Sequence, residues 1–376
     1  WATIPDARVG VYVASPRLQT NTAISRLSVD SANPYLLGFG AASLAEVSLS
    51  EGTGTAYSAH KVRGWEAGDS LPTVAVRGEV LEFALPLAAL GELQSGDELR
   101  LVAVVSSGER DLQSLPSSGP GQLILPDISN IAYFLEVTDP QGDDNGPGAY
   151  TYPQDALFTP GVFDLKEFKA GADEDNLIFK LSFYGAVPNP WGSPNNLALQ
   201  TLDVYIDKDP GAGTGARLLL PGRNAAFTSG SGWEYAIWAE GWTPQVVAPD
   251  ASTLEPKEVA GASFRLVVDP GSSTVTIRLP RSVVGEGDPA TWGYAAAVLS
   301  QEGFPAAGVW RVRDGQETAA QWRFGGVPAG ATNYPRILDL IDTGDQAAQL
   351  TFTPSTAEVG ALTPDDFAQV SVLKAQ

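Results

Sequence analysis

A succession of short β-forming runs, with no helical pattern of comparable length, is the feature that most constrains this fold. From residue 177 onward, six runs are rich in β-branched and aromatic residues, and each is bounded by Gly, Pro or Asp. Helical signals are limited to short turns at Pro86–Leu90 and Pro280–Val284. The pattern predicts an all-β protein made of antiparallel β-sandwiches. The six runs are Leu177–Tyr184, Thr201–Asp207, Tyr235–Glu240, Phe264–Val268, Thr274–Leu279 and Gly293–Ser300.

The composition excludes several kinds of chemistry. The chain has no Cys, no Met and a single histidine, His60, so disulfides, thiolate metal sites, Met-ligated haem and multi-histidine sites are excluded. We expect His60 to be an exposed loop residue. The formal net charge of −21 disfavours nucleic acid and anionic lipid as partners, and it leaves carboxylates available for calcium. No apolar run reaches the roughly 18 residues of a membrane-spanning helix, so we expect no membrane insertion.

The two halves of the chain resemble each other. Three stretches of the first half echo three of the second, and the paired anchors Tyr12 and Tyr205 differ by 193 positions (205 − 12). The other two pairs hold nearly the same offset, which predicts an internal duplication. The paired stretches are Val9–Arg17 with Leu202–Pro210, Leu81–Glu92 with Val275–Glu286, and Val102–Glu109 with Ala296–Gly303.

The strongest local signal is an acidic loop at residues 137–153, with the sequence VTDPQGDDNGPGAYTYP. Calcium takes about six to eight oxygen ligands, and glycines let the backbone bend so that neighbouring carboxylates face one point. We therefore predict a Ca²⁺ site. The predicted ligands are Asp139, Asp143, Asp144, Asp155 and Asp164. Asp203 and Asp207 are alternative ligands, and a solvated acidic turn without metal is the simpler interpretation.

The loop and several later motifs, in order, resemble the C-terminal module of glucodextranases, which also accompanies some amylopullulanases. The resemblance covers residues 133–349 and extends to a wider group of β-sandwiches, the DOMON-like domains and family 9 carbohydrate-binding modules. It implies a calcium-bound sandwich that binds carbohydrate or the cell surface without catalysis. The motifs are DPQGDDNGPGAYTYP at residues 139–153, FTPGVFDLKEF at 158–168, NPWGSPNNLALQTLDVYID at 189–207, LPGRNAAF at 220–227, WEYAIWAEGW at 233–242 and WRFGG at 322–326.

These observations divide the chain into tandem sandwiches. Residues 1–128 form a partial DOMON-like sandwich, residues 133–350 form the glucodextranase-like one, and residues 351–376 form a tail or the start of a further strand. The duplication leaves the first repeat without a counterpart of residues 133–194. We expect the chain to be part of a longer polypeptide, with strand donation from a neighbouring subunit as the alternative, because an open sheet edge is rarely left exposed.

Tryptophans in turn-rich surroundings are the candidate carbohydrate platform, because the apolar faces of sugars stack on aromatic rings. Trp191 and Trp242 are flanked by Pro, Gly and Thr. Trp310 is a third candidate, with Arg311 and Arg313 as hydrogen-bond donors to hydroxyl groups. Tyr235 completes the predicted carbohydrate-binding residues, whereas we expect Trp292 and Trp322 to lie in the core.

The sequence therefore predicts a non-catalytic, extracellular, calcium-bound pair of carbohydrate-binding modules within a larger α-glucan-degrading or cell-surface protein. The predicted partners are a polysaccharide, an α-glucan or a cell-surface glycan, and also copies of the chain itself. The alternative is a structural surface-layer or filament protein assembled from β-sandwich repeats by strand donation. Catalysis is disfavoured because glycosidases usually rest on helix-rich barrels, which this pattern lacks.

Overall fold

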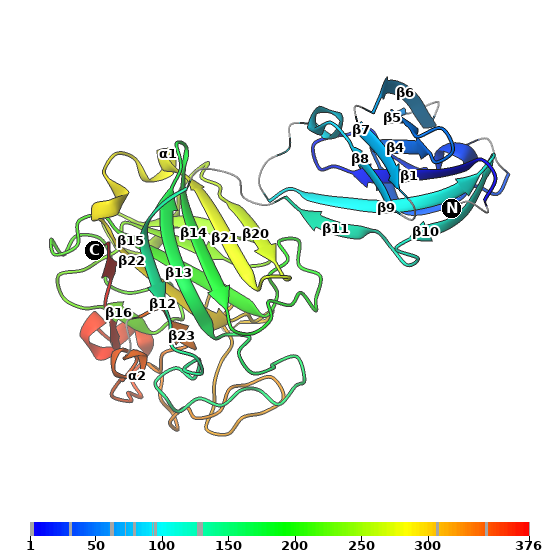
Figure 1. The fold of residues 1–376 in the computed structure, drawn as a ribbon. Coiled ribbons are helices and arrows are strands. Elements are labelled where there is room, and N and C mark those ends of the chain that lie inside the picture. The colour runs from blue at the N-terminus through cyan, green and yellow to red at the C-terminus, as the bar shows by residue number, and fades with distance from the viewer. Residues whose placement is uncertain are drawn as a thin grey trace. The chain divides into compact units, whose positions relative to one another are not determined.

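The computed structural model describes residues 4–29, 32–60, 64–71, 73–77, 80–91, 93, 96–125, 131–305, 308–342 and 345–375 (Figure 1). The chain divides into two compact units, Trp1–Ser129 and Asn130–Gln376. Every hydrophobic cluster is built from residues of one unit alone. No helix in the described ranges is long and apolar enough to cross a membrane.

The first unit is built on one antiparallel sheet, in the order β10-β9-β1-β4-β5-β6, with β11 also paired to β9. Two small hairpins, β2–β3 and β7–β8, accompany it. His60 ends β5 and pairs with Gly64, so it is a half-buried strand residue and not the predicted exposed loop residue. The bounds are β1 (Ala7–Ala14), β2 (Thr22–Ile24), η1 (Arg26–Ser28), β3 (Leu36–Ala41), β4 (Ser43–Ser48), β5 (Thr53–His60), β6 (Gly64–Ser70), β7 (Thr73–Arg77), β8 (Val80–Ala84), η2 (Leu87–Leu90), β9 (Glu98–Ser107), β10 (Arg110–Leu115) and β11 (Gly121–Ile124).

The two hairpins of the first unit cover opposite faces of its sheet. Successive side chains of a strand point to opposite faces, so Leu44 and Ala45 of β4 belong to different clusters. Leu44 packs with Leu37 of the β2–β3 hairpin, whereas Ala45 packs with Val74 and Phe83 of the β7–β8 hairpin. The first unit is therefore a small sandwich whose second layer is only two strands wide on the β7–β8 side.

The second unit contains two larger sheets, of order β12-β13-β14-β21-β20 and β19-β18-β17-β15-β22-β23, with β25 also paired to β22 (Figure 1). All pairs within them are antiparallel, so the predicted all-β fold is confirmed, and the six predicted strands match to within one residue at each end. The bounds are β12 (Ala132–Thr138), β13 (Leu165–Ala172), β14 (Asn176–Phe183), β15 (Gln200–Asp207), β17 (Tyr235–Ala239), β18 (Gln245–Pro249), β19 (Pro256–Glu258), β20 (Arg265–Asp269), β21 (Thr274–Pro280), β22 (Gly293–Ser300), β23 (Asp339–Leu340) and β25 (Leu373–Lys374).

The central strand β15 is buried on both faces, because a third layer lies outside the second sheet. Val204 and Ile206 point into the cluster between the two sheets, whereas Tyr205 points into a second cluster on the outer face. The parallel pair β16–β24 and the loops around it supply that outer layer. The remaining elements are β16 (Ala225–Phe227), β24 (Ala368–Val370), α1 (Arg281–Val284), α2 (Gln346–Gln349), η3 (Pro289–Thr291), η4 (Val359–Ala361) and η5 (Pro364–Asp366).

The last residues of the chain pack into the second unit. β24 pairs with β16 and β25 pairs with β22, so the segment after residue 350 contributes two short strands to the second unit. Phe367, Ala368 and Val370 of this segment are buried. The sequence left a tail or the start of a further strand open for this segment; β24 joins the outer layer, and β25 extends the second sheet.

The two units share a strand-pairing scheme. Tyr12 of β1 lies opposite Leu44 of β4 and Val102 of β9, and Tyr205 of β15 lies opposite Ala236 of β17 and Ala295 of β22. The hairpin β7–β8 stands where the second unit has β20–β21. In the second unit β21 also pairs with β14, but β8 pairs only with β7 among the described residues. Strands equivalent to β12, β13 and β14 are absent from the described part of the first unit.

Candidate functional site

Four acidic side chains converge near the ends of β12, β13 and β23. Asp139 directly follows β12, Asp143 lies in the next loop, Asp164 precedes β13 and Asp339 begins β23. Carboxylate oxygens of Asp139, Asp143 and Asp339 lie within 4.8 Å of one another. Asp164 lies close enough to Asp143 and Asp339 to interact with them electrostatically. We call these four residues the carboxylate cluster.

Each member of the carboxylate cluster keeps one buried oxygen without a hydrogen-bond partner among the described residues. An unpartnered buried polar atom is costly, and more so when it is charged. Carboxylate oxygens gathered in this way, with three of the four residues within 4.8 Å of one another, are the donor set that a hard cation prefers. The unpartnered atoms are Asp139 Oδ2, Asp143 Oδ1, Asp164 Oδ1 and Asp339 Oδ1. Backbone N–H groups bind other oxygens, from Asp342 to Asp139 at 3.1 Å, from Gly142 to Asp164 at 2.9 Å and from Leu165 to Asp339 at 2.5 Å.

Burial raises the pKa of all four carboxyl groups above the ordinary value of 3.8, and the neighbouring carboxylates raise it further. The pKa of Asp139 rises to about 8 and that of Asp164 to about 7. These two groups therefore hold protons far above the usual pH range of an aspartic acid when no cation is bound. A bound divalent cation would favour the ionised form and reverse this effect.

The acidic loop is held against Leu338 and Gln346. Gly146 adopts φ +64°, and a Cβ atom there would lie 2.6 Å from the ring of Tyr150, so only glycine fits. Its N–H donates to the carbonyl of Leu338 at 2.8 Å, and the side chain of Gln346 donates to the carbonyls of Asp143 and Gly146. These bonds bring Asp339 to a loop that lies far from it in the sequence.

The structure brings three of the five predicted metal ligands together. Asp139, Asp143 and Asp164 belong to the carboxylate cluster. Asp144 accepts a hydrogen bond from the hydroxyl of Tyr152, and with Asp164 it lines an adjacent open cavity of about 490 Å³. The N–H groups of Gly142, Leu165 and Asp342 bond carboxylates that lie 22, 174 and 203 positions away, so the backbone of one segment fixes the carboxylate of another.

Asp155 does not join the cluster. Its Oδ1 accepts from the backbone N–H of Leu157 at 3.1 Å, and its Oδ2 accepts from Gln321 at 3.3 Å. The carboxylate is therefore used to form a turn and to attach the loop that carries Trp322. Sequence reasoning in turn missed Asp339. The available signal was an aspartate between Leu338 and Leu340 in an apolar run, where a charged residue is rarely buried without a partner.

The alternative ligands on β15 have other roles. Asp203 forms a fully buried two-point ion pair with Arg223, with N–O distances of 2.6 and 2.8 Å, and it also accepts from the hydroxyl of Tyr205. Asp207 lies within 4.8 Å of Asp209 and Glu234 by carboxylate oxygens, but backbone N–H groups donate to both of its own oxygens. The unpartnered buried oxygens are thus a property of the carboxylate cluster and not of this second group.

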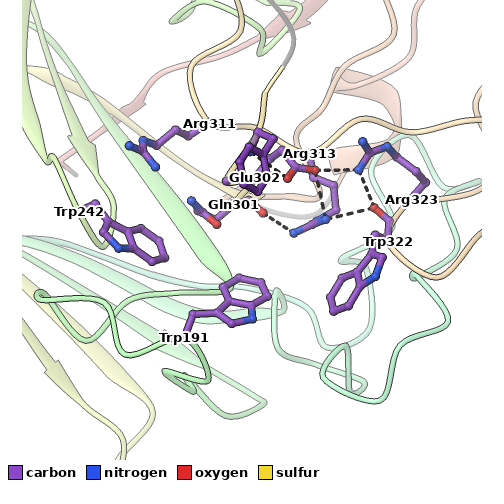
Figure 2. Close-up of a pocket in the computed structure, with 10 residues that line it drawn as sticks. Trp191, Trp242, Gln301, Glu302, Arg311, Arg313, Trp322 and Arg323 are labelled. Atoms are coloured by element: carbon purple, nitrogen blue, oxygen red, sulfur yellow. Dashed lines mark hydrogen bonds and ion pairs between the residues drawn. The ribbon is translucent and has the colours of Figure 1, made fainter.

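A groove of about 650 Å³ opens between loops of the second unit. Loops that follow β14, β17 and β22 supply Trp191, Trp242 and Glu302, and the loop at residues 316–325 supplies Trp322. Figure 2 shows the three indole rings around the floor of this space, with Trp191 between Trp242 and Trp322. We call it the aromatic groove. Its full lining is Trp191, Trp242, Gln301, Glu302, Gly303, Phe304, Arg311, Arg313, Trp322 and Arg323.

The aromatic rings of the groove are accessible. Trp191 is 40% exposed, Trp242 and Trp322 are half-buried, and Phe304 is 92% exposed. The centroids of the Trp191 and Trp322 rings lie 6.4 Å apart, with an angle of 51° between their planes. Trp322 was expected in the core, but its position at the edge of the Phe158 cluster leaves one face of the ring toward the groove. Phe304 was not identified from the sequence, although Gly and Pro flank it.

Polar groups on the opposite wall of the groove are organised around Glu302. Figure 2 shows Arg313 and Arg323 converging on it, at N–O distances of 3.3 and 2.7 Å. Arg313 also donates to the backbone carbonyl of Trp322 and so fixes the loop of that tryptophan. Arg311 stands apart from this network, with its guanidinium 5.8 Å from the ring centroid of Trp242. Ion pairs and hydrogen bonds thus fix Arg313 and Arg323 in the wall, which is rich in hydrogen-bond donors.

The other two predicted platform residues lie outside the groove. Trp310 packs on Trp238, with ring centroids 5.2 Å apart, as part of the outer cluster of the second sheet. Tyr235 packs against the cluster between the two sheets, beside Lys208. Trp292 is 3% exposed and lies in the core as expected. Trp191 and Trp242 are thus the two predicted carbohydrate-binding residues that the structure brings into one cavity.

A β-sandwich with an open aromatic groove between its loops has the form of a ligand-binding module. The chain belongs to the family of the C-terminal, SLH-like binding module of glucodextranase, whose model matches residues 134–360. That family is a binding module and not a catalytic domain. No curated protein matches the chain.

Proposed function

We propose that the second unit binds a glycan in the aromatic groove, as a non-catalytic module of an extracellular or cell-surface protein. The observation that carries the proposal is the arrangement of Trp191, Trp242 and Trp322 around one open cavity. Flat rings at an angle to each other suit the C–H faces of successive sugar residues, and polar groups on the facing wall suit their hydroxyls. The family name, a binding module of glucodextranase, favours an α-glucan as the first ligand to try.

Affinity electrophoresis of the full chain through gels that contain soluble starch, pullulan or dextran tests this proposal. We expect retardation in at least one α-glucan gel, and Trp191→Ala and Trp242→Ala should each weaken it about tenfold or more, because each removes a stacking platform. Trp310→Ala is the matched control, because this ring packs on Trp238 outside the groove. Equal retardation of Trp191→Ala and wild type would locate any glycan site elsewhere.

We propose in addition that the carboxylate cluster holds Ca²⁺. Support comes from the four unpartnered buried oxygens and from the raised pKa values, both of which a divalent cation would offset. The residues that would hold the ion are Asp139, Asp143 and Asp339, with Asp164 beside them. The ion would join the ends of β12 and β23 to the acidic loop, and it would therefore act on stability and loop order.

Thermal unfolding after removal of metal tests the calcium proposal. We expect a chelator to lower the Tm of the second unit and added Ca²⁺ to restore it, because a ligand that binds only the folded state stabilises it. Asp339→Asn should abolish the response to Ca²⁺. Asp155→Asn is the matched control and should keep the response, because Asp155 lies outside the cluster. A Tm that chelator leaves unchanged would contradict the proposal.

A second candidate function, assembly by strand donation, is favoured by the first unit. The shared pairing scheme of β1 and β15 supports an internal duplication in which the described first unit lacks the equivalents of β12–β14. The outer edge of β8 is left without a partner strand among the described residues, beside the exposed side chain of Val80. An unpaired edge of this kind can accept a strand from another copy of the chain.

Light scattering coupled to gel filtration tests strand donation. We expect assemblies that grow with protein concentration and that Val80→Lys reduces, because a lysine on a sheet edge opposes further pairing. Glu66→Lys is a control with a new lysine on β6, which ends the larger sheet of the same unit and does not belong to the β7–β8 sheet. A monodisperse monomer at all concentrations would eliminate this candidate and leave the glycan-binding proposal untouched.

A further inference from the structure

We infer that the aromatic groove selects an anionic saccharide, a glycan that carries carboxylate groups, through Arg311. This inference rests on the proposed glycan-binding function and names the class of glycan. It follows from the charges that line the groove, from the contacts of the Arg311 side chain and from the backbone conformation of Arg311.

The charges of the groove are opposite to those of the whole chain. Three arginines line it, Arg311, Arg313 and Arg323, against one carboxylate, Glu302. Three positive charges less one negative charge leave a net charge of +2, whereas the whole chain carries −21. Because Glu302 already binds both Arg313 and Arg323, its charge is shared within the wall. The excess positive charge is therefore available to a ligand.

Arg311 is the arginine that can meet this ligand directly. No carboxylate forms an ion pair with it among the described residues, and its guanidinium lies over the ring of Trp242 at 5.8 Å. A contact of this kind attracts the guanidinium to the ring face, and no described residue accepts a hydrogen bond from its N–H groups. A carboxylate is the acceptor that fits this planar fork with two parallel hydrogen bonds. Figure 2 shows Arg311 beside Trp242 and away from the Glu302 network.

The backbone conformation of Arg311 is energetically unfavourable. Its φ is +47°, in the left-handed region that a long side chain rarely occupies. Hydrogen bonds on both sides fix this conformation, since the N–H of Arg311 donates to Val309 at 3.1 Å and its carbonyl accepts from Glu302 at 2.9 Å. A strained residue that the surroundings hold in place often serves binding, because its side chain is preorganised. Gln301, which also lines the groove, has an amide nitrogen with no partner among the described residues.

A saccharide fits these features better than a polyanion such as nucleic acid. The tryptophans provide apolar platforms for sugar rings, and the groove is lined by more arginines than carboxylates within a chain of net charge −21. A long polyanion would extend over the rest of a strongly acidic protein and would be repelled there. A glycan with isolated carboxylates among neutral sugars avoids this repulsion and still reaches Arg311.

Titration calorimetry of the full chain with a matched pair of ligands tests the inference. The pair is a set of pullulan fragments and the same fragments with a minor share of their C6 hydroxymethyl groups oxidised to carboxylates. We expect the oxidised fragments to bind about tenfold tighter at low ionic strength, which is the gain of a charge-assisted hydrogen bond, and this ratio to shrink as salt is added. Arg311→Gln should bring the ratio close to one.

Arg281→Gln is the matched control. It removes one positive charge from the exposed helix α1, outside the groove, and should leave the ratio unchanged. A ratio of one or less for wild type, or a high ratio that persists in Arg311→Gln, would overturn the inference. Binding of the neutral fragments alone, lost in Trp191→Ala, would overturn it and keep the glycan-binding proposal. Binding of neither set, or of a single-stranded oligonucleotide only, would overturn both.

Discussion

At the scale of single residues, the second unit buries aspartates in two different ways. Asp203 is fully buried, and both of its carboxylate oxygens accept hydrogen bonds, from Arg223 and from the hydroxyl of Tyr205. Asp139 and Asp339 are also buried, yet each keeps an oxygen that no described residue hydrogen-bonds. The first arrangement is complete in the chain alone, whereas the second leaves buried oxygens that the proposed Ca²⁺ would bind.

The carboxylate cluster predicts an unusual pH dependence of stability for the metal-free protein. The pKa of Asp139 is about 8 and that of Asp164 about 7 in the folded chain, above the ordinary 3.8 that applies to the unfolded chain. The folded state then holds more protons between about pH 4 and pH 8, so its free energy of unfolding falls as pH rises through this window. Thermal melts of metal-stripped protein at several pH values measure this fall.

Calcium should remove most of that pH dependence, because bound carboxylates are already ionised. The affinity for Ca²⁺ should therefore rise from pH 5 to pH 8, and Asp139→Asn should flatten the metal-free curve. The half-buried Asp250, in a turn outside the carboxylate cluster, supplies the matched control Asp250→Asn. A metal-free Tm that increases steadily from pH 5 to pH 8 would contradict the raised pKa values.

The buried ion pair predicts a large loss of stability when one partner is removed. Arg223→Met should cost about 3–5 kcal/mol, because Asp203 would stay buried without a counter-charge. Arg217→Met is the matched control, since its partner Asp365 is 77% exposed, and should cost less than about 1 kcal/mol. Denaturant unfolding of the two variants measures the difference. Equal small losses would mean that water reaches Asp203 in the variant.

At the scale of elements, the second sheet is unusual because both of its faces are covered. All eight residues of β15 and all eight of β22 are buried. The third layer that covers the outer face includes β24, whose Val370 packs in the same cluster as Tyr205. A strand buried on one face needs alternating apolar residues, whereas one buried on two faces must also place its polar residues in specific contacts. The buried Asp203 on β15 follows from this arrangement.

A charge in β24 should therefore destabilise the second unit. Val370→Asp places a carboxylate in an apolar cluster without a partner, and it should lower the stability of this unit by about 3 kcal/mol or more. Ser371→Asp introduces the same charge one residue later, on an exposed side chain, and should change stability by less than about 0.5 kcal/mol. Thermal unfolding followed by near-ultraviolet circular dichroism compares them. If Val370→Asp left the Tm unchanged, β24 would not be needed to stabilise the outer layer.

At the scale of the whole molecule, the chain is two folding units with separate cores. The clusters of the first unit draw only on residues before 129, and those of the second only on residues after 130. The carboxylate cluster and the aromatic groove both lie within the second unit. The family match also falls entirely inside it, at residues 134–360. The proposed binding function thus belongs to a part of the chain that can be isolated.

The fragment of residues 131–376 should fold on its own and keep both proposed ligand responses. Its core needs no residue from the first unit, so its Tm should lie within a few degrees of the corresponding transition of the full chain. The fragment 131–350 lacks β24 and β25 and should melt at a clearly lower temperature. Calorimetric scans of both fragments and of the full chain provide the measurement. An unfolded 131–376 fragment would show that the first unit supports the second.

Much of this protein could be predicted from local sequence. The six runs from Leu177 to Ser300 became strands within one residue at each end, because β-branched and aromatic residues bounded by turn formers act locally. The loop at residues 137–153 was identified by its spacing of aspartates and glycines. Trp191 and Trp242 were identified because turn residues flank them. Each of these signals depends on neighbours within a few positions of the chain.

Tertiary structure alone decided which of these residues meet. Asp339 belongs to the carboxylate cluster although it is remote in sequence. Asp155 lies outside the cluster, where it forms a turn and binds the loop that carries Trp322. Trp310 packs in the outer cluster of the second sheet, which no local sequence pattern predicts. Trp322 lines the groove. The physical reason is the same in each case. The alternation of a strand determines which side chains share a face of the sheet. Which layer covers that face depends on segments that are distant in the sequence.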